Sequence, residues 1–344
     1  MTSDIYYISC QPADYYYSWQ IDAMLLSFEK NGNINLHNVH IIGAIKHDKI
    51  HERYRRVDEK WTKKGVLFAY YTDTRKSPSY ISSIRPHILE KHWNFHPYLE
   101  QSTFFYHDCD IALTKPLVLH DKLNLDKTCF VSDTSSYISS DYIIDRGEDL
   151  FFKMCEIIDI DFNEVKSRDS EAGGAQYLIK PGITSKYWQD VYRDSESLYS
   201  EMRPLIGIKK QSNPDWNTLQ IWCADMWAVL WNLWKAGYKT PITKDFDFTW
   251  GTSTILYWDK NAIFHNAGVL KESTLEDTEI GPFYKALSRS PENPPTDQLR
   301  PADKFASSKY YDLVVSSYNT TDQKNEPVIV TKQVTPETII RKRI

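Results

Sequence analysis

The sequence lacks the features that mark several large classes of protein. No apolar run approaches the about 20 residues that a membrane-spanning helix needs, and the first residues show neither the basic segment nor the apolar segment of a secretory signal. The five cysteines are odd in number and scattered, which is typical neither of a disulfide framework nor of a zinc knuckle. We therefore expect a soluble protein of the reducing cytoplasm.

No sign of charge dominates the chain. The 41 basic and 46 acidic residues give a net charge of −5, so there is no bulk attraction to nucleic acid or to an anionic membrane. Kinase, zinc-deaminase and nucleophile-elbow signatures are also missing. Charged residues at 25% and apolar residues at 41% are ordinary for a globular protein, and 344 residues suffice for one large α/β domain with additions.

The first half of the chain alternates short apolar runs with helical patterns. We expect strands over residues 5–9, 39–45, 66–71 and 102–107, and helices over residues 15–30, 48–61 and 82–93. The helix over 48–61 is highly charged, so we expect it to be mostly exposed. The alternation predicts an α/β fold with a mostly parallel central sheet flanked by helices.

Two aspartates stand directly after the strand expected over 102–107. Asp108 and Asp110 are two residues apart, at the carboxyl end of that strand, where open α/β sheets place their ligands. Two carboxylates provide the hard oxygen ligands that Mg²⁺ or Mn²⁺ bridging a diphosphate requires. Taken alone, the motif is equally consistent with a polar turn that closes a strand.

A second motif follows much later in the chain. His265, Gly268 and Lys271 form an H-x-x-G-x-x-K pattern after a short apolar run. A neutral imidazole completes a divalent-metal site begun by carboxylates, a glycine permits close approach of the backbone to a ligand, and a lysine supplies a point charge for phosphate. Each residue alone also has an ordinary explanation, as a strand end, a turn or a solvated cation.

The two motifs together resemble those of nucleotide-sugar-dependent glycosyltransferases of the GT-A fold. The pairing is most similar to the glycogenin-type family 8 enzymes, and the surrounding sequence is similar to peptidyl-serine galactosyltransferases and hydroxyproline arabinosyltransferases. The resemblance implies that Asp108, Asp110 and His265 hold Mn²⁺ or Mg²⁺. It also implies that Lys271, with Gly268 beside it, binds the diphosphate of a UDP-sugar, which Asp108 contacts as well.

The same resemblance implies roles for further residues. Arg85, in the helix expected before the D-x-D strand, becomes a contact on the nucleotide side. Gly173, Gly174 and Gln176 become part of a glycine-containing loop that lines the sugar pocket, and Gln176 one of the catalytic residues. From the residues alone, the paired glycines are equally consistent with a tight turn into a strand.

An apolar, tryptophan-rich pattern over residues 216–236 predicts the strongest helix of the chain, with Asp225 in its middle. A carboxylate in that position has to find hydrogen-bond donors, lose its charge or face a polar cleft, because unpaired burial costs several kcal/mol. A buried structural aspartate would satisfy this requirement. The resemblance favours an acid that faces the reacting sugar, so we expect Asp225 to be catalytic.

These observations predict a metal-dependent glycosyltransferase that moves a sugar from a UDP-sugar to a hydroxyl acceptor, which is a glycan, a protein or a modified base. The resemblance implies retention of the anomeric configuration. We expect a GT-A domain over 1–290, with a nucleotide-binding half over 1–125 and an acceptor-binding half over 126–290, and a wrapping arm or partly disordered tail over 291–344.

Two alternatives remain open from the sequence. One is a glycosyltransferase that acts on a modified DNA base and touches it through the basic stretch 46–64. The other is a non-catalytic module that binds a saccharide or a nucleotide, for which the high aromatic content of 14% would be suited.

Overall fold

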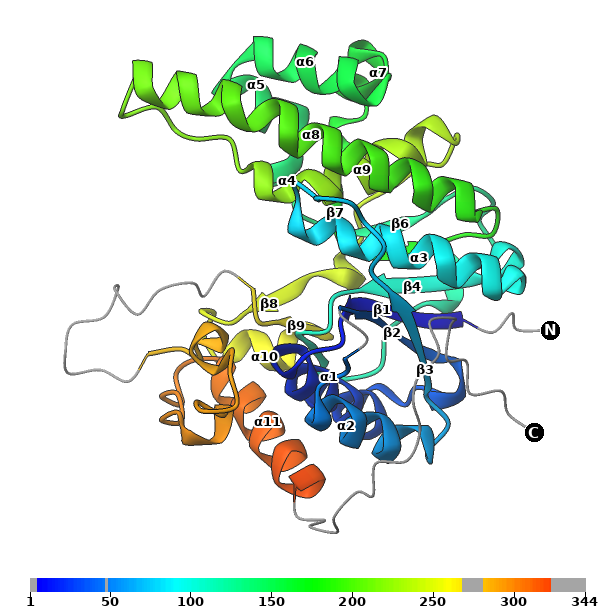
Figure 1. Cartoon of the computed structure of the whole chain (residues 1–344), viewed down its shortest axis with the longest axis vertical. Helices are drawn as coiled ribbons and strands as arrows, with labels where there is room; N and C mark the ends of the chain where they lie inside the picture. The colour runs from blue at the N-terminus through cyan, green and yellow to red at the C-terminus, as the bar shows by residue number, and fades with distance from the viewer. Residues whose placement is uncertain (1–4, 47–48, 268–280, 323–344) are drawn as a thin grey trace. The chain divides into compact units, whose positions relative to one another are not determined.

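The computed structural model describes residues 5–46, 49–267 and 281–322. In this part of the chain, a six-stranded sheet has the strand order β3-β2-β1-β4-β7-β6, and a smaller sheet has the order β5-β9-β8 (Figure 1). The strands β1, β2 and β3 are parallel to one another, while β6 and β7 are antiparallel. The predicted α/β class with a mostly parallel sheet flanked by helices is confirmed.

The strands are β1 (Ile5–Pro12), β2 (Val39–Ile45), β3 (Leu67–Thr72), β4 (Thr103–His107), β5 (Ile111–Leu113), β6 (Phe130–Asp133), β7 (Gly173–Ile179), β8 (Phe248–Trp250) and β9 (Ile263–His265). The helices are α1 (Tyr15–Ser27), α2 (Glu52–Thr62), α3 (Ile84–Phe95), α4 (Ser135–Ile138), α5 (Ser140–Arg146), α6 (Glu148–Ile158), α7 (Phe162–Ser167), α8 (Ser185–Ser212), α9 (Ala224–Lys235), α10 (Leu256–Lys260) and α11 (Ser307–Asp322). In the described ranges, none of these helices is long and apolar enough to cross a membrane.

The chain divides into two compact units, each made of several segments. We call the first the D-x-D unit; it comprises Tyr6–Thr72, His107–Leu119 and Asp245–Ile344. We call the second the long-helix unit; it comprises Met1–Ile5, Asp73–Tyr106 and His120–Lys244.

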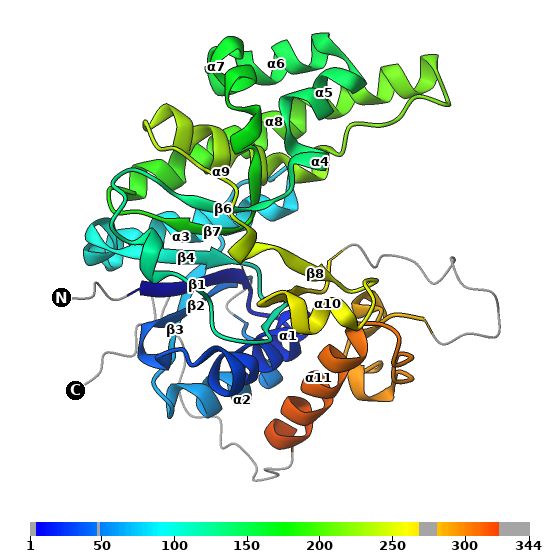
Figure 2. The ribbon, with the colours of Figure 1, turned by 180° about the vertical axis from the view of Figure 1, so that it is seen from behind.

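In the D-x-D unit, helix α1 packs against both α2 and α11 (Figure 2). Its carboxylate Asp22 is fully buried and is surrounded by donors from the other two helices: Arg53, Lys60 and Trp61 of α2 and Thr321 of α11. The expectation that the helix at 48–61 is mostly exposed is therefore wrong for its described part, α2. Arg53 is buried and Lys60 is partly buried beside Asp22, which neutralises both, whereas Glu52 and Arg55 of the same helix are exposed.

In the long-helix unit, α8 packs against both α3 and α9 (Figure 1). The predicted elements do not include α8, which has 28 residues and continues past Pro204. They include one helix over 216–236, which is wrong at its start. Residues Ile221–Cys223 form a separate 3-10 turn and α9 begins at Ala224. Asp225 consequently lies in the first turn of α9, where the positive end of the helix dipole favours a carboxylate.

The paired glycines lie in a strand and not in a loop, which corrects the loop expectation and agrees with the alternative of a turn leading into a strand. Gly173 and Gly174 are the first residues of β7 and face Asp133 and Ser132 of β6. The register shifts at this point, and the residue with a left-handed backbone is Ala175, whose φ is 67°. A side chain on Gly173 would lie 2.4 Å from the carbonyl oxygen of Ser132, so the close approach of the two strands requires glycine.

Candidate metal centre

The two sequence motifs meet because of strand pairing in the smaller sheet. Asp108 and Asp110 lie in the short connection between β4 and β5, and His265 ends β9. Strands β5 and β9 are antiparallel with Ile111 opposite His265, and the backbone N–H of Asn266 donates to the carbonyl of Asp110 at 2.9 Å. The pairing brings the imidazole to the carboxylates. All of these residues belong to the D-x-D unit.

The three side chains form a compact set of possible metal ligands. One ligand atom from each of Asp108, Asp110 and His265 lies within 4.8 Å of the others. The Nε2 atom of His265 is 3.2 Å from Oδ1 of Asp110 and 3.5 Å from Oδ2 of Asp108. Asp110 is buried, whereas the side chain of Asp108 is 33% exposed, so the set is open on one side. This geometry agrees with the predicted metal-binding group.

Lys285 is a member of the centre that sequence reasoning missed. Its ammonium forms an ion pair with Oδ2 of Asp110. Burial would raise the pKa of the Asp110 carboxyl, but the Lys285 ammonium and the His265 imidazole hold it well below its usual value. Burial lowers the pKa of Lys285, and the charge of Asp110 more than offsets this, so that the pKa of Lys285 is raised. Both groups of the pair therefore stay charged at neutral pH.

The turn that carries Lys285 is fixed by hydrogen bonds on both sides. It is a 3-10 turn over Lys285–Ser288. The indole N–H of Trp19 in α1 donates to the carbonyl of Ser288 at 3.1 Å, and the amide of Gln298 donates to the carbonyl of Tyr284 at 3.2 Å. No pattern in the sequence linked this turn to the two motifs, because only the folding of the chain past α1 brings it to Asp110.

A buried histidine supports the backbone of the centre. His107 ends β4, and its Nδ1 lies 2.8 Å from the carbonyl oxygen of Asp108. Burial lowers the pKa of His107 to about 4, so its ring is neutral at physiological pH. A neutral ring at this position adds no positive charge beside the carboxylates and leaves them available to a cation.

The chemistry of the donor set fits a hard divalent ion. Carboxylate oxygens with one imidazole nitrogen suit Mn²⁺ or Mg²⁺ better than a soft metal, which would prefer thiolates. Asn266, directly after His265, is fully buried, and neither polar atom of its side chain has a hydrogen-bond partner among the described residues. A buried amide without partners is costly, and an ion with its waters held at the centre would supply polar groups for such an amide.

Two of the predicted site residues pair with each other in the long-helix unit. The guanidinium of Arg85 in α3 forms an ion pair with Oδ2 of Asp225 in α9. The hydroxyl of Tyr80 lies 2.6 Å from Oδ1 of the same carboxylate. Asp225 is thus buried with its charge compensated, and its catalytic role and the nucleotide contact of Arg85 stay predictions.

The remaining predicted residues lie in β7 or outside the described ranges. A Cβ on Gly174 would meet the end of Met226, the neighbour of Asp225, at 3.0 Å, so β7 passes close to the start of α9. Gln176 is fully buried, and its carboxamide oxygen accepts a hydrogen bond from the Ser132 hydroxyl at 2.6 Å. Gly268 and Lys271 fall outside the described residues. The roles predicted for these residues and for Gly173 stay predictions.

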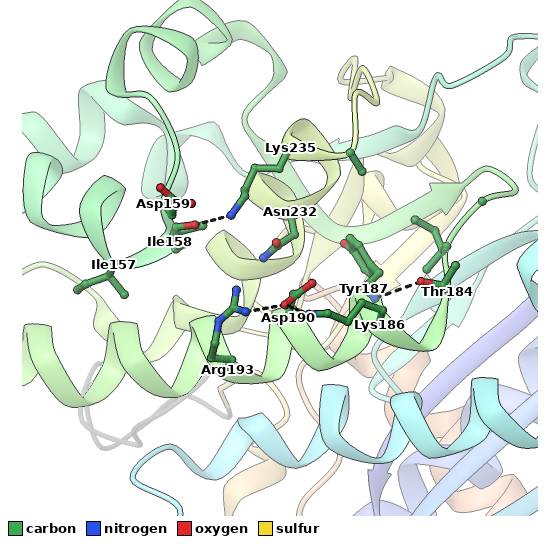
Figure 3. Close-up of a pocket in the computed structure, with 13 residues that line it drawn as sticks. Ile157, Ile158, Asp159, Thr184, Lys186, Tyr187, Asp190, Arg193, Asn232 and Lys235 are labelled. Atoms are coloured by element: carbon green, nitrogen blue, oxygen red, sulfur yellow. Dashed lines mark hydrogen bonds and ion pairs between the residues drawn. The ribbon is translucent and has the colours of Figure 1, made fainter.

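The long-helix unit also has a cavity of about 560 Å³ between the end of α6 and the helices α8 and α9 (Figure 3). None of the predicted site residues lines it. Lys186 and Arg193 both form ion pairs with Asp190 at its edge, and Lys235 donates to the carbonyl of Ile158 (Figure 3). Because these charges are satisfied by the protein itself, the cavity does not point to a charged ligand.

Comparison with known proteins gives a similarity of structure and none of sequence. No family model matches the chain, and no curated protein matches it. Among solved structures, the bifunctional glycosyltransferase WbbM in its apo form is similar, with a TM-score of 0.46 and 9% sequence identity over 95% of this chain. The chain spans 50% of the length of that protein. At this level of similarity, the residues of the metal centre have to carry any assignment of function.

Proposed function

We propose that the protein is a metal-dependent glycosyltransferase that transfers a sugar from a UDP-sugar to a hydroxyl group of an acceptor. The observation that supports this proposal is the joining of the D-x-D carboxylates, Asp108 and Asp110, with His265 in one compact set of possible metal ligands. These residues are the ones that the resemblance to GT-A enzymes assigns to the metal. The ammonium of Lys285 beside them is a further cation suited to a diphosphate.

The residues of the centre can bind the metal and stabilise the diphosphate leaving group. Asp108, Asp110 and His265 would hold Mn²⁺ or Mg²⁺, which supplies electrostatic stabilisation of the diphosphate leaving group. Lys285 adds a positive charge on the same side of Asp110. The connection between β4 and β5 is fixed by the His107 contact and by the pairing of β5 with β9, so the carboxylates are positioned before any ligand arrives.

Metal-dependent binding of UDP tests the proposal. Calorimetric titration with UDP, in the presence and absence of Mn²⁺, is expected to show binding that requires the metal. Asp110→Ala and His265→Ala each lower the affinity for Mn²⁺ in the presence of UDP by about tenfold or more, because each removes a ligand. Asp259→Ala, which removes an exposed carboxylate of the same unit, is the matched control and leaves the affinity unchanged. Binding of UDP that ignores both Mn²⁺ and Asp110→Ala would contradict the proposal.

We propose retention of the anomeric configuration, as the resemblance implies. Proton NMR of the linkage formed from a UDP-sugar reports the configuration of the product directly. An inverting enzyme needs a carboxylate base beside the acceptor hydroxyl. A product of inverted configuration would therefore overturn the family resemblance and direct the search to such a base.

The alternative with a modified DNA base as acceptor loses two cations of the basic stretch 46–64. Arg53 and Lys60 form ion pairs with the buried Asp22, and cations neutralised in this way contribute little to binding of a phosphate backbone. Lys46, Arg55 and Lys63 are exposed, and Lys64 pairs with Glu29 at the surface. The non-catalytic alternative differs from the proposal in its products, because such a module binds saccharide without releasing UDP from any UDP-sugar in the presence of Mn²⁺.

A further inference from the structure

Lys285 is paired with a carboxylate that a metal ion also requires. A divalent ion held by the centre needs the carboxylate of Asp110, which is the most buried acid of the set. The ammonium of Lys285 is already paired with Oδ2 of that carboxylate, and its side chain is only 17% exposed. Two cations that share one buried carboxylate repel each other more strongly than they would in water. Lys285 and the metal are therefore competitors for Asp110.

The summed charges of the centre indicate which ligand would allow Lys285 and the metal to be bound together. Asp108 and Asp110 carry two negative charges and Lys285 one positive charge, while a histidine that binds a metal does so uncharged. A divalent ion makes the sum positive. Arg289, one turn after Lys285, adds a further positive charge, with its guanidinium 4.8 Å from the ring centre of Tyr16. A nucleoside diphosphate supplies the negative charges that this arrangement then lacks.

Lys285 combines a held backbone with a long side chain. Its turn is held by Trp19 and Gln298, so the backbone stays beside the centre. The four-carbon stem of a lysine allows the ammonium to rotate between neighbouring acceptors. The ammonium can thus leave the carboxylate without leaving the centre.

We propose that Lys285 is a positioning residue that couples the binding of the metal to the binding of the nucleoside diphosphate. Its ammonium neutralises Asp110 in the free protein and passes to a phosphate oxygen when metal and diphosphate bind together. The metal alone then binds weakly, and the diphosphate strengthens its binding. This inference rests on the proposed function, but it makes a separate statement about the order of binding.

Titration of the full chain with Mn²⁺, in the absence and in the presence of UDP, measures the coupling as the ratio of the two affinities. Lys285→Met keeps the length of the side chain and removes its charge. We expect Mn²⁺ alone to bind this variant about tenfold or more tightly than it binds the wild type, and UDP to strengthen the binding of Mn²⁺ less than in the wild type. Lys285→Arg keeps the charge and is expected to keep the coupling. Lys309→Met removes an exposed cation of α11 and is the matched control.

A second measurement covers the case in which Lys285→Met weakens the fold. A ligand that binds the folded protein raises its melting temperature according to its affinity, so Mn²⁺ alone is expected to raise the melting temperature of Lys285→Met more than that of the wild type. If Lys285→Met binds Mn²⁺ no more tightly than the wild type while UDP-dependent binding of Mn²⁺ persists, the inference is wrong and the proposed function survives. If neither the wild type nor any variant binds Mn²⁺, with or without UDP, the inference on Lys285 and the proposed function are both wrong.

Discussion

The carboxylate of Asp225 and the guanidinium of Arg85 form an ion pair, and the hydroxyl of Tyr80 completes the contacts of that carboxylate. The resemblance described above predicts a catalytic role for Asp225 and a nucleotide contact for Arg85. Their direct contact means that a change in one alters the environment of the other. Any test of either residue has to include both.

We predict that Asp225→Asn lowers turnover by about 100-fold or more while UDP binding is retained. The amide keeps the size of the side chain and can still accept a hydrogen bond from Tyr80, but it has no negative charge to offer to a reacting group. Steady-state kinetics of the folded fraction and calorimetric titration with UDP measure the two quantities.

Arg85→Gln serves as the comparison for Asp225→Asn. If the pair is only structural, both variants lower the melting temperature to a similar extent and leave turnover per folded molecule nearly intact. A loss of turnover in Asp225→Asn that exceeds the loss in Arg85→Gln identifies the carboxylate as the functional group. If both variants lower only the melting temperature, and by the same amount, Asp225 has a structural role in holding α3 against α9.

Glycine substitutions in β7 are predicted to have unequal effects on stability. A Cβ at Gly173 would lie 2.4 Å from the backbone carbonyl of Ser132, which cannot move without disturbing the strand pair. A Cβ at Gly174 meets only side-chain atoms, the hydroxyl of Tyr177 at 2.5 Å and the terminal methyl of Met226 at 3.0 Å, and no backbone atom. We expect Gly173→Ala to lower the free energy of unfolding by about 3 kcal/mol and Gly174→Ala to lower it by about 1 kcal/mol.

Gly207→Ala is the control for both glycine substitutions. Gly207 lies in α8 with no heavy atom within 4 Å of an added Cβ. We expect this variant to raise the free energy of unfolding by about 0.5–1 kcal/mol, because alanine favours the helix. Urea unfolding of the three variants measures all of these differences, and equal effects of Gly173→Ala and Gly174→Ala would show that the two strands can separate.

The buried carboxylate of Asp22 is predicted to anchor α11 to the rest of the D-x-D unit. It pairs with Arg53 and Lys60 and accepts a hydrogen bond from Thr321 at 2.6 Å. We expect Asp22→Asn to lower the free energy of unfolding by about 3–5 kcal/mol, because it removes the buried counter-charge of Lys60 and leaves the buried Arg53 with the more distant Asp322, at 3.7 Å. We expect Thr321→Val to lower it by about 1 kcal/mol. Asp312→Asn removes an exposed partner of Arg300 and should cost less than about 1 kcal/mol. An Asp22→Asn effect as small as this one would contradict the anchoring role.

The pH dependence of stability is predicted from His87. Burial lowers its pKa to about 4, with Lys91 adding to the effect. The ring is thus neutral in the folded protein, whereas in the unfolded chain it takes up a proton near pH 6.5. Unfolding therefore takes up a proton between about pH 4 and 6.5, and the free energy of unfolding falls as the pH is lowered through this range.

Urea unfolding at about pH 7.5, 6 and 5 tests this dependence. His87→Gln keeps a hydrogen-bonding group near Thr74, which His87 contacts at 3.1 Å, and should make the decline with falling pH shallower. His120→Gln, which changes an exposed histidine, should leave it unaltered. The same decline in wild type and His87→Gln would mean that other groups control acid sensitivity.

Helix α9 shows how far pattern alone can locate an element. The tryptophans and leucines after Ala224 are buried as their helical spacing predicts. The apolar residues before Ala224 continue the same pattern, yet the chain there forms a 3-10 turn and leaves Trp222 exposed. Hydrophobic spacing reports which residues can be buried together, but where a helix begins depends on the neighbours that receive it. For this reason the pattern predicts Asp225 in the middle of a helix, whereas the residue lies in the first turn of α9.

What the sequence determined by itself was local: the alternation of strands and helices, the D-x-D at the end of a buried strand and the histidine at the end of another. Each follows from periodicity and side-chain chemistry within a few residues. The tertiary structure alone decided that Lys285 would face Asp110 and that Arg85 would pair with Asp225. These contacts join segments far apart in the chain. The first contact depends on the packing of α1 against the turn Lys285–Ser288, and the second on the packing of α3 and α9 against α8. No short-range sequence pattern predicts this packing.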